Sequence, residues 1–115
     1  MLGETIFRQL EDIAAIATAH KAGKKFVFLG HDDTANPLTQ FAYGVFAAGE
    51  SSDYHTHATM EEYFFVIKGE GSCTISGHRY PLKAGCFLRI PAGALHSLDA
   101  DGTSALEFIY FGIAE

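Results

Sequence analysis

From Leu38 to the end of the chain, strand-sized apolar runs alternate with short turns that contain glycine. Such runs, with no helical pattern between them, are typical of a β-sandwich or a small barrel. Ser76-Gly77-His78 has the composition of a hairpin turn. We therefore expect an all-β domain. Its predicted strands are Lys25–Leu29, Leu38–Ala47, Tyr54–His57, Glu62–Lys68, Ser72–Ser76, Arg79–Leu82, Cys86–Ile90, Leu95–Leu98 and Leu106–Phe111.

The N-terminal part of the chain follows a different period. Apolar residues recur there at helical spacing, namely Leu2, Ile6, Leu10, Ile13 and Ala17. This pattern predicts an amphipathic helix over residues 4–20, ended by Gly23. The Lys21–Lys25 cluster is interpreted as the solvated end of that helix, which we expect to cap the barrel or to meet a partner subunit.

A length of 115 residues fits one domain with a single core. We expect a single domain over 1–115, with a helical segment at 1–23 and the barrel core at 38–112. Cys73 and Cys86 each lie in an apolar run and lack a C-x-x-C pattern, so buried free thiols are the preferred interpretation. A disulfide between them is the alternative.

Charge and hydropathy exclude some partners. The formal net charge of −6 argues against nucleic acid and anionic membranes, because both bind positively charged patches. No run approaches the roughly 20 apolar residues that a membrane helix needs. The N-terminus has no basic leader followed by an apolar run, so we expect a cytoplasmic protein.

Three histidines and a carboxylate lie in two segments, Gly49–Gly69 and Gly85–His96. Side chains alternate along a strand, so His55 and His57 point the same way. A carboxylate from the next strand and His96 from a distant one would complete a metal site. Imidazole and carboxylate donors together suit a divalent transition metal ion, and we expect one per chain: Fe, Mn, Ni, Zn or Co.

The spacing of these residues carries a family resemblance. The first segment runs G-x5-H-x-H-x4-E-x6-G and the second runs G-x5-P-x-G-x2-H. Both patterns resemble the two motifs of cupins, and the gap Glu70–Ala84 is similar to that of compact single-domain bacterial cupins of the RmlC-like (cupin 2) type. The resemblance covers about Leu38–Phe111 and implies a double-stranded β-helix, or jelly-roll, barrel. It also implies the metal ligands His55, His57, Glu62 and His96.

Some residues near these motifs are open to other interpretations. Ala100 stands where the second motif often has an asparagine, which is not a ligand in the family. Glu61 is adjacent to Glu62 but faces away by strand parity. Asp99 is interpreted as a turn cap rather than a residue that orients a ligand histidine. Two interpretations stay open for Arg89 and Glu107: each side chain either lines the pocket or faces solvent. The remaining histidines are interpreted as ordinary core or surface residues: His20, His31 and His78.

Strand parity also predicts an apolar outer face. If Glu62 faces the interior, then Tyr63, Phe65 and Ile67 face outward. A face this apolar needs a cover, which the N-terminal helix, a second sheet or another copy of the chain would provide. We therefore expect a homodimer.

These observations favour a metal-dependent enzyme that acts on a small polar or anionic metabolite. Oxygenation at Fe(II) and isomerisation both fit, although the sequence offers no evident general base. The alternative is a non-catalytic module that binds or senses a small ligand. A third possibility is a structural subunit that the metal stabilises. Whether the chain is an enzyme is left open.

Overall fold

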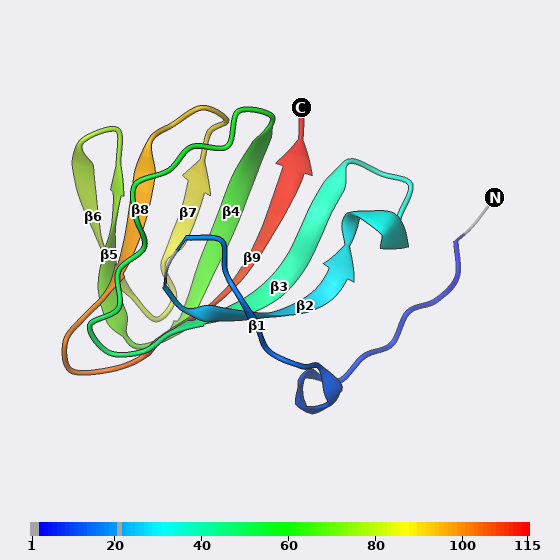
Figure 1. Cartoon of the computed structure of the whole chain (residues 1–115), viewed down its shortest axis with the longest axis horizontal. Coiled ribbons are helices and arrows are strands. Elements are labelled where there is room, and N and C mark those ends of the chain that lie inside the picture. Colours follow the sequence, from blue (N-terminus) through cyan, green and yellow to red (C-terminus); the bar gives the residue numbers. More distant parts are fainter. Residues whose placement is uncertain (1–2, 21) are drawn as a thin grey trace.

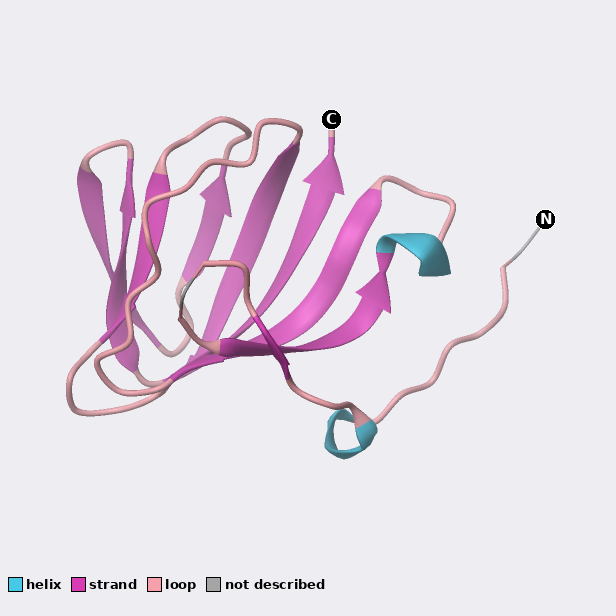
Figure 2. Cartoon of the chain, viewed as in Figure 1, coloured by secondary structure: helices cyan, strands magenta, loops and turns pink. Residues whose placement is uncertain are grey.

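The computed structural model describes residues 3–20 and 22–115, whose strands form two antiparallel sheets around a common interior (Figure 1). Strands and loops make up nearly all of the chain, with two short helical turns (Figure 2). The elements in chain order are η1 (Leu10–Asp12), β1 (Ile16–Ala17), β2 (Lys24–Gly30), η2 (His31–Asp33), β3 (Leu38–Phe46), β4 (Met60–Lys68), β5 (Glu70–Ile75), β6 (His78–Lys83), β7 (Phe87–Ile90), β8 (His96–Ala100) and β9 (Leu106–Ala114).

The two sheets form the all-β jelly-roll barrel that the sequence predicts. The larger sheet has the strand order β1-β2-β3-β9-β4-β7, and the smaller sheet has the order β6-β5-β8. The last strand, β9, lies between β3 and β4 (Figure 1). Strands that are far apart in the sequence therefore become neighbours.

The core lies between the sheets. Along β9, Leu106, Phe108 and Tyr110 are buried while the residues between them are partly exposed. Cys73 and Leu98 contribute to the same cluster from the smaller sheet. The period of two that predicts a strand thus also selects the side chains that fill the barrel. Cys73 and Cys86 are free thiols, as expected, but only Cys73 is buried, whereas Cys86 is partly exposed.

The hairpin between β5 and β6 confirms a prediction from composition. Ser76 and Gly77 both have positive φ, 48° and 84°. The flanking residues Ile75 and His78 are paired across the turn. Two consecutive left-handed residues are the signature of a type I′ hairpin, and glycine adopts that conformation without a Cβ penalty.

One predicted strand, Tyr54–His57, is wrong. The segment lies in the connection between β3 and β4, where only His55 forms an isolated bridge to β8; a second bridge comes from Ser51, before the segment. A side chain interrupts the ladder there, because the hydroxyl of Ser52 accepts the hydrogen bond from the backbone N–H of Leu98 at 2.8 Å. The connection nevertheless runs beside β8 like an irregular strand.

The predicted helix over residues 4–20 is also wrong. Among the described residues 3–20, the structure contains only the turn η1 and the two-residue strand β1. Phe7 is 82% exposed and Ile16 is 49% exposed, so no apolar surface receives the expected stripe. A short helix is marginal in water without such packing. Leu2 and Lys21, which belonged to that prediction, lie outside the described residues.

Contacts with β2 hold the N-terminal segment in its extended form. The guanidinium of Arg8 donates to the backbone carbonyl of Phe28 and lies 3.3 Å from the carboxylate of Asp33. Ile16 and Ala17 pair with the start of β2. The larger sheet thus begins at Ile16, before the core boundary of 38–112 that the sequence predicts. The single-domain division stays a prediction.

The outer face of the larger sheet is apolar, as strand parity predicts. Tyr63 stacks on Phe111 with ring centroids 4.9 Å apart. Phe65, Ile67 and Phe87 remain 48%, 42% and 63% exposed. Among the described residues, no helix covers this face, and none is long and apolar enough to cross a membrane.

Candidate metal centre

Four side chains from separate parts of the barrel converge on one point. One donor atom from each of His55, His57, Glu62 and His96 lies within 4.8 Å of the others. Glu62 comes from β4 and His96 from the start of β8. His55 and His57 come from the connection between β3 and β4. The residues that meet here are those that the sequence predicts as ligands.

Backbone hydrogen bonds fix the histidine-bearing connection against β8. His55 and His96 each donate their backbone N–H to the carbonyl of the other, at 2.9 Å. The N–H of Gly93, in the turn before β8, donates to the carbonyl of His57 at 2.8 Å. The rings of His55 and His96 consequently lie 4.2 Å apart between centroids.

Two of the imidazoles are oriented by backbone carbonyls. Nδ1 of His55 lies 2.9 Å from the carbonyl oxygen of Asp53, and Nδ1 of His96 lies 2.9 Å from that of Ala94. A carbonyl oxygen only accepts, so each bond requires the proton on Nδ1. That tautomer leaves the lone pair on Nε2, which is the arrangement of a metal-ligating histidine.

Glu62 is ionised in this cluster. Its side chain is buried, and burial alone raises the pKa of a carboxyl group. The hydrogen bond from the imidazole of His57 is the main effect that outweighs burial and holds the pKa of Glu62 at about 2. The carboxylate in turn raises the pKa of His57. Burial, by contrast, lowers the pKa of His55.

The donor set fits a cation. Nε2 of His96 is buried and has no hydrogen-bond partner among the described residues, although Oε1 of Glu62 lies 3.5 Å away. The Oε1 atom also lies 3.3 Å from Nε2 of His57. Metal bonds of about 2.0–2.2 Å place neighbouring donors about 3 to 4 Å apart, which matches these separations. A cation between the donors would satisfy the lone pairs of His96 and Glu62, which otherwise face one another.

The cluster opens into a cavity of about 230 Å³. Pockets for drug-sized ligands usually measure about 300–1,000 Å³, so this one suits a smaller molecule. Its apolar wall includes Phe46, Met60, Phe64, Ile90, Leu98, Phe108 and Tyr110. Its polar lining, beside the cluster itself, includes Thr18, His20, Lys25, Gln40 and Ser52.

His20 is the site residue that sequence reasoning missed. Its ring stacks on that of His55, with centroids 3.5 Å apart and planes 7° apart. Nδ1 of His20 also lies 3.6 Å from the carboxylate of Asp53. The interpretation of His20 as an ordinary core or surface residue is therefore wrong. Because it was assigned to a helix, no pattern in the sequence placed it near the motifs.

The other residues weighed in the sequence lie outside the cluster. Glu61 faces outward and binds Arg89, with Nε 3.2 Å from its carboxylate. Glu107 accepts a hydrogen bond from Tyr43 on the same outer face. Asp99 makes no side-chain hydrogen bond to a ligand histidine within the described part of the chain. His31 and His78 are surface residues, as expected.

Comparisons with known proteins agree with this architecture. The family model described as Cupin domain matches residues 42–112. A protein of Thermotoga maritima named "Oxalate-binding protein" is 29% identical over 93 residues, which cover 77% of each chain.

Two solved structures share the fold. A predicted oxalate decarboxylase of Thermotoga maritima superposes with a TM-score of 0.87 and 23% identity, covering 96% of this chain and 100% of that one. Ectoine synthase from P. lautus superposes with a TM-score of 0.82 and 21% identity, covering 96% of this chain and 78% of that one. At these identities, the likeness extends to the fold alone.

Proposed function

The chain belongs to the cupin family, and from this premise we propose that it binds one divalent transition metal ion and acts on a small anionic metabolite. The observation that carries the proposal is the unpartnered, buried Nε2 of His96 facing the ionised carboxylate of Glu62. His55, His57, Glu62 and His96 would hold the ion, with Fe, Mn, Ni, Zn and Co as the candidates.

Charge favours an anionic ligand. Neutral imidazoles add no charge, and Glu62 contributes one negative charge, so a divalent ion would leave the cluster net positive. When bound, such an ion supplies Lewis-acid or redox chemistry to oxygen atoms of a ligand. The small, largely apolar cavity supports a compact ligand with few polar groups.

We propose an enzyme of the oxygenase or isomerase type as the first candidate. The face of the cavity beside His55 carries the imidazole of His20, a polar group that does not belong to the ligand set. Its ring is within reach of a molecule bound beside the cluster, where it would orient the ligand through a hydrogen bond.

A second candidate, a non-catalytic module that binds or senses a small ligand, rests on the comparisons. The relative of Thermotoga maritima is named for binding oxalate rather than for converting it. In this case the four ligands and the cavity would hold a carboxylate without turning it over.

The metal site is tested by elemental analysis of the purified and metal-reconstituted chain. We expect about one metal ion per chain in the parent and a strong loss in His57→Ala. His78→Ala is the matched control, because His78 is exposed on β6 and should keep full occupancy. Equal metal content in the parent and His57→Ala would contradict the proposal.

The two candidate functions are separated by turnover. The chain is reconstituted with Fe(II) without oxygen, then mixed with a panel of small carboxylates while oxygen uptake and product formation are followed. Uptake supports an oxygenase, and conversion without uptake supports an isomerase. Tight binding without any conversion supports the binding module and contradicts the enzyme.

We also propose that the chain forms a homodimer through the outer face of the larger sheet. Phe65, Ile67 and Phe87 lie exposed there, and monomeric proteins rarely expose large contiguous apolar patches. The cytoplasmic location expected from the sequence stays a prediction.

A further inference from the structure

Lys25 points into the barrel. On β2 it pairs in register with Gly44 of β3. The flanking positions of β3 on the same face, Ala42 and Phe46, are buried in the core. Gly44 has no side chain, and the ring of Phe108 fills the space over it, where an added Cβ would lie 2.4 Å from the ring. Lys24 belongs to the other face by alternation and is exposed, although it is also among the residues that line the cavity.

The ammonium group of Lys25 is only partly satisfied. Its Nζ donates to Oε1 of Gln40 at 3.0 Å, and both side chains line the cavity. No ion pair among the described residues includes Lys25. The carboxylate that lines the cavity, Glu62, is already engaged by the cluster. A lysine has three N–H donors, so donor capacity remains for an anion.

The register relates Gln40, the hydrogen-bond partner of Lys25, to the cluster. Gln40 and Glu62 both pair with Gly112 of β9, so they occupy one row across β3, β9 and β4. At about 4.8 Å per strand, their backbones are roughly 10 Å apart. Both side chains line the same cavity, so one ligand can contact both.

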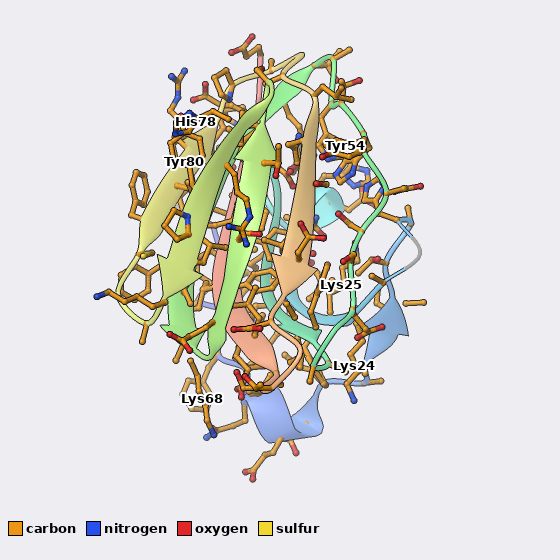
Figure 3. The ribbon with its side chains drawn as sticks, turned by 90° about the vertical axis from the view of Figure 1, so that its left-hand side faces the viewer. Lys24, Lys25, Tyr54, Lys68, His78 and Tyr80 are labelled. Atoms are coloured by element: carbon orange, nitrogen blue, oxygen red, sulfur yellow. The ribbon has the colours of Figure 1, made fainter. Side chains whose placement is uncertain are left out.

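Figure 3 places Lys25 on the side of the barrel where the connection between β3 and β4 runs, below Tyr54. That connection also carries His55 and His57. Lys25 and all four residues of the cluster line one cavity, so they belong to one continuous site.

The charges at this site favour a dianion. A divalent ion, the carboxylate of Glu62 and the ammonium of Lys25 together leave a net charge of about +2, by the ionic states at neutral pH. A ligand with two separated carboxylates neutralises this charge at both ends. The cavity has a largely apolar wall, which includes Phe108 and Met60, and such a wall suits a methylene chain.

We propose that the ligand of this cavity is a short linear dicarboxylate, longer than the two-carbon diacid, with one carboxylate at the four-residue cluster and the other on Lys25. Gln40 is the positioning residue that orients the ammonium group. This inference rests on the proposed function, since the cluster is taken to hold a metal ion.

The test compares two probes of the same length and shape, succinate and its monoamide succinamate. Calorimetric titration of the zinc-loaded chain should show succinate binding roughly 10- to 100-fold more tightly, because a charge-assisted hydrogen bond is lost with the second carboxylate. In Lys25→Met the preference should fall to about one. Lys68→Met is the matched control, since Lys68 is exposed outside this cavity, and it should keep the preference.

If Lys25→Met folds poorly, a second variant tests the same subsite. In Gln40→Glu the new carboxylate competes for Lys25, so succinate should lose affinity while succinamate keeps it. An unchanged ratio of the two affinities in either variant would overturn the dicarboxylate subsite, as would equal binding of both probes by the parent. Metal content, measured before any probe is added, reports separately on the proposed function.

Discussion

The imidazole of His20 lies face to face with that of His55, with ring centroids 3.5 Å apart and planes 7° apart. His20 follows β1 and precedes β2, whereas His55 belongs to the long connection between β3 and β4. The backbone N–H of Asp53 also donates to the carbonyl of His20, at 3.3 Å. The N-terminal segment thus packs against the candidate metal ligand His55 and helps to fix its position.

This stacking predicts different effects for two substitutions of His20. His20→Ala removes the ring that fixes His55 and should weaken metal affinity by about 10-fold, the lower range for residues that orient a ligand. His20→Phe keeps a planar ring and should stay within about threefold of the parent by the same reasoning. Competition with a chromogenic chelator measures both. Equal losses in the two variants would contradict a stacking role.

The adjacent carboxylates Glu61 and Glu62 should behave oppositely. Glu62→Gln removes the charge that faces two imidazoles in a buried cluster, so metal content should fall strongly. Glu61→Gln alters an outward-facing pair with Arg89 and should leave metal content unchanged. Elemental analysis of both variants checks this, and metal loss in Glu61→Gln would show that the parity argument assigns the wrong residue.

Metal binding should release a proton near neutral pH. Interaction with Glu62 raises the pKa of His57, so this imidazole is partly protonated at pH 7 in the metal-free chain. A metal ion needs the neutral form and displaces the proton. Release should be largest below the raised pKa of His57 and should decline as the pH rises above it. Titrations in buffers of different ionisation enthalpy measure the protons released, and no release at pH 6.5 would contradict the expectation.

The sequence predicts the barrel and the convergence of the four candidate ligands well, because both follow from local patterns and fixed spacings. Alternating burial selects strands such as β9, and the fixed spacing of His55, His57 and Glu62 survives even though the first two residues are not in a regular strand. The role of His20 and the inward direction of Lys25 depend on which strands become neighbours. That information is not contained in a local period.

In the N-terminal segment, by contrast, the local pattern predicts the wrong structure. Ile6, Leu10 and Ile13 have helical spacing, but spacing stabilises a helix only where a surface receives its apolar face. Arg8 instead ties the segment to β2, and the two-residue strand β1 extends the larger sheet. Contacts between distant parts of the chain thus outweighed the local pattern.

Alanine substitutions at two glycines distinguish the cost of steric overlap from the cost of backbone strain. Both Gly69 and Gly77 have positive φ, 89° and 84°. A Cβ at Gly69 would lie 1.9 Å from the carbonyl oxygen of Ala105, whereas one at Gly77 would meet open space. We expect Gly77→Ala to lower the free energy of unfolding by about 1–2 kcal/mol and Gly69→Ala by about 3 kcal/mol or more. Urea denaturation measures both, and similar losses would contradict the steric argument.

The apolar outer face predicts that the chain associates in solution. Phe65 and Phe87 are paired in register on neighbouring strands β4 and β7, and both side chains are exposed. Phe65→Lys places a charge at the centre of this patch, where its desolvation would oppose close packing against a second copy. Sedimentation should show a dimer for the parent and a monomer for Phe65→Lys.

Tyr80→Lys is the control, because Tyr80 is exposed on β6 in the smaller sheet and its variant should stay dimeric. A parent that sediments strictly as a monomer would contradict the dimer, and a dimer that survives Phe65→Lys would move the interface to another face.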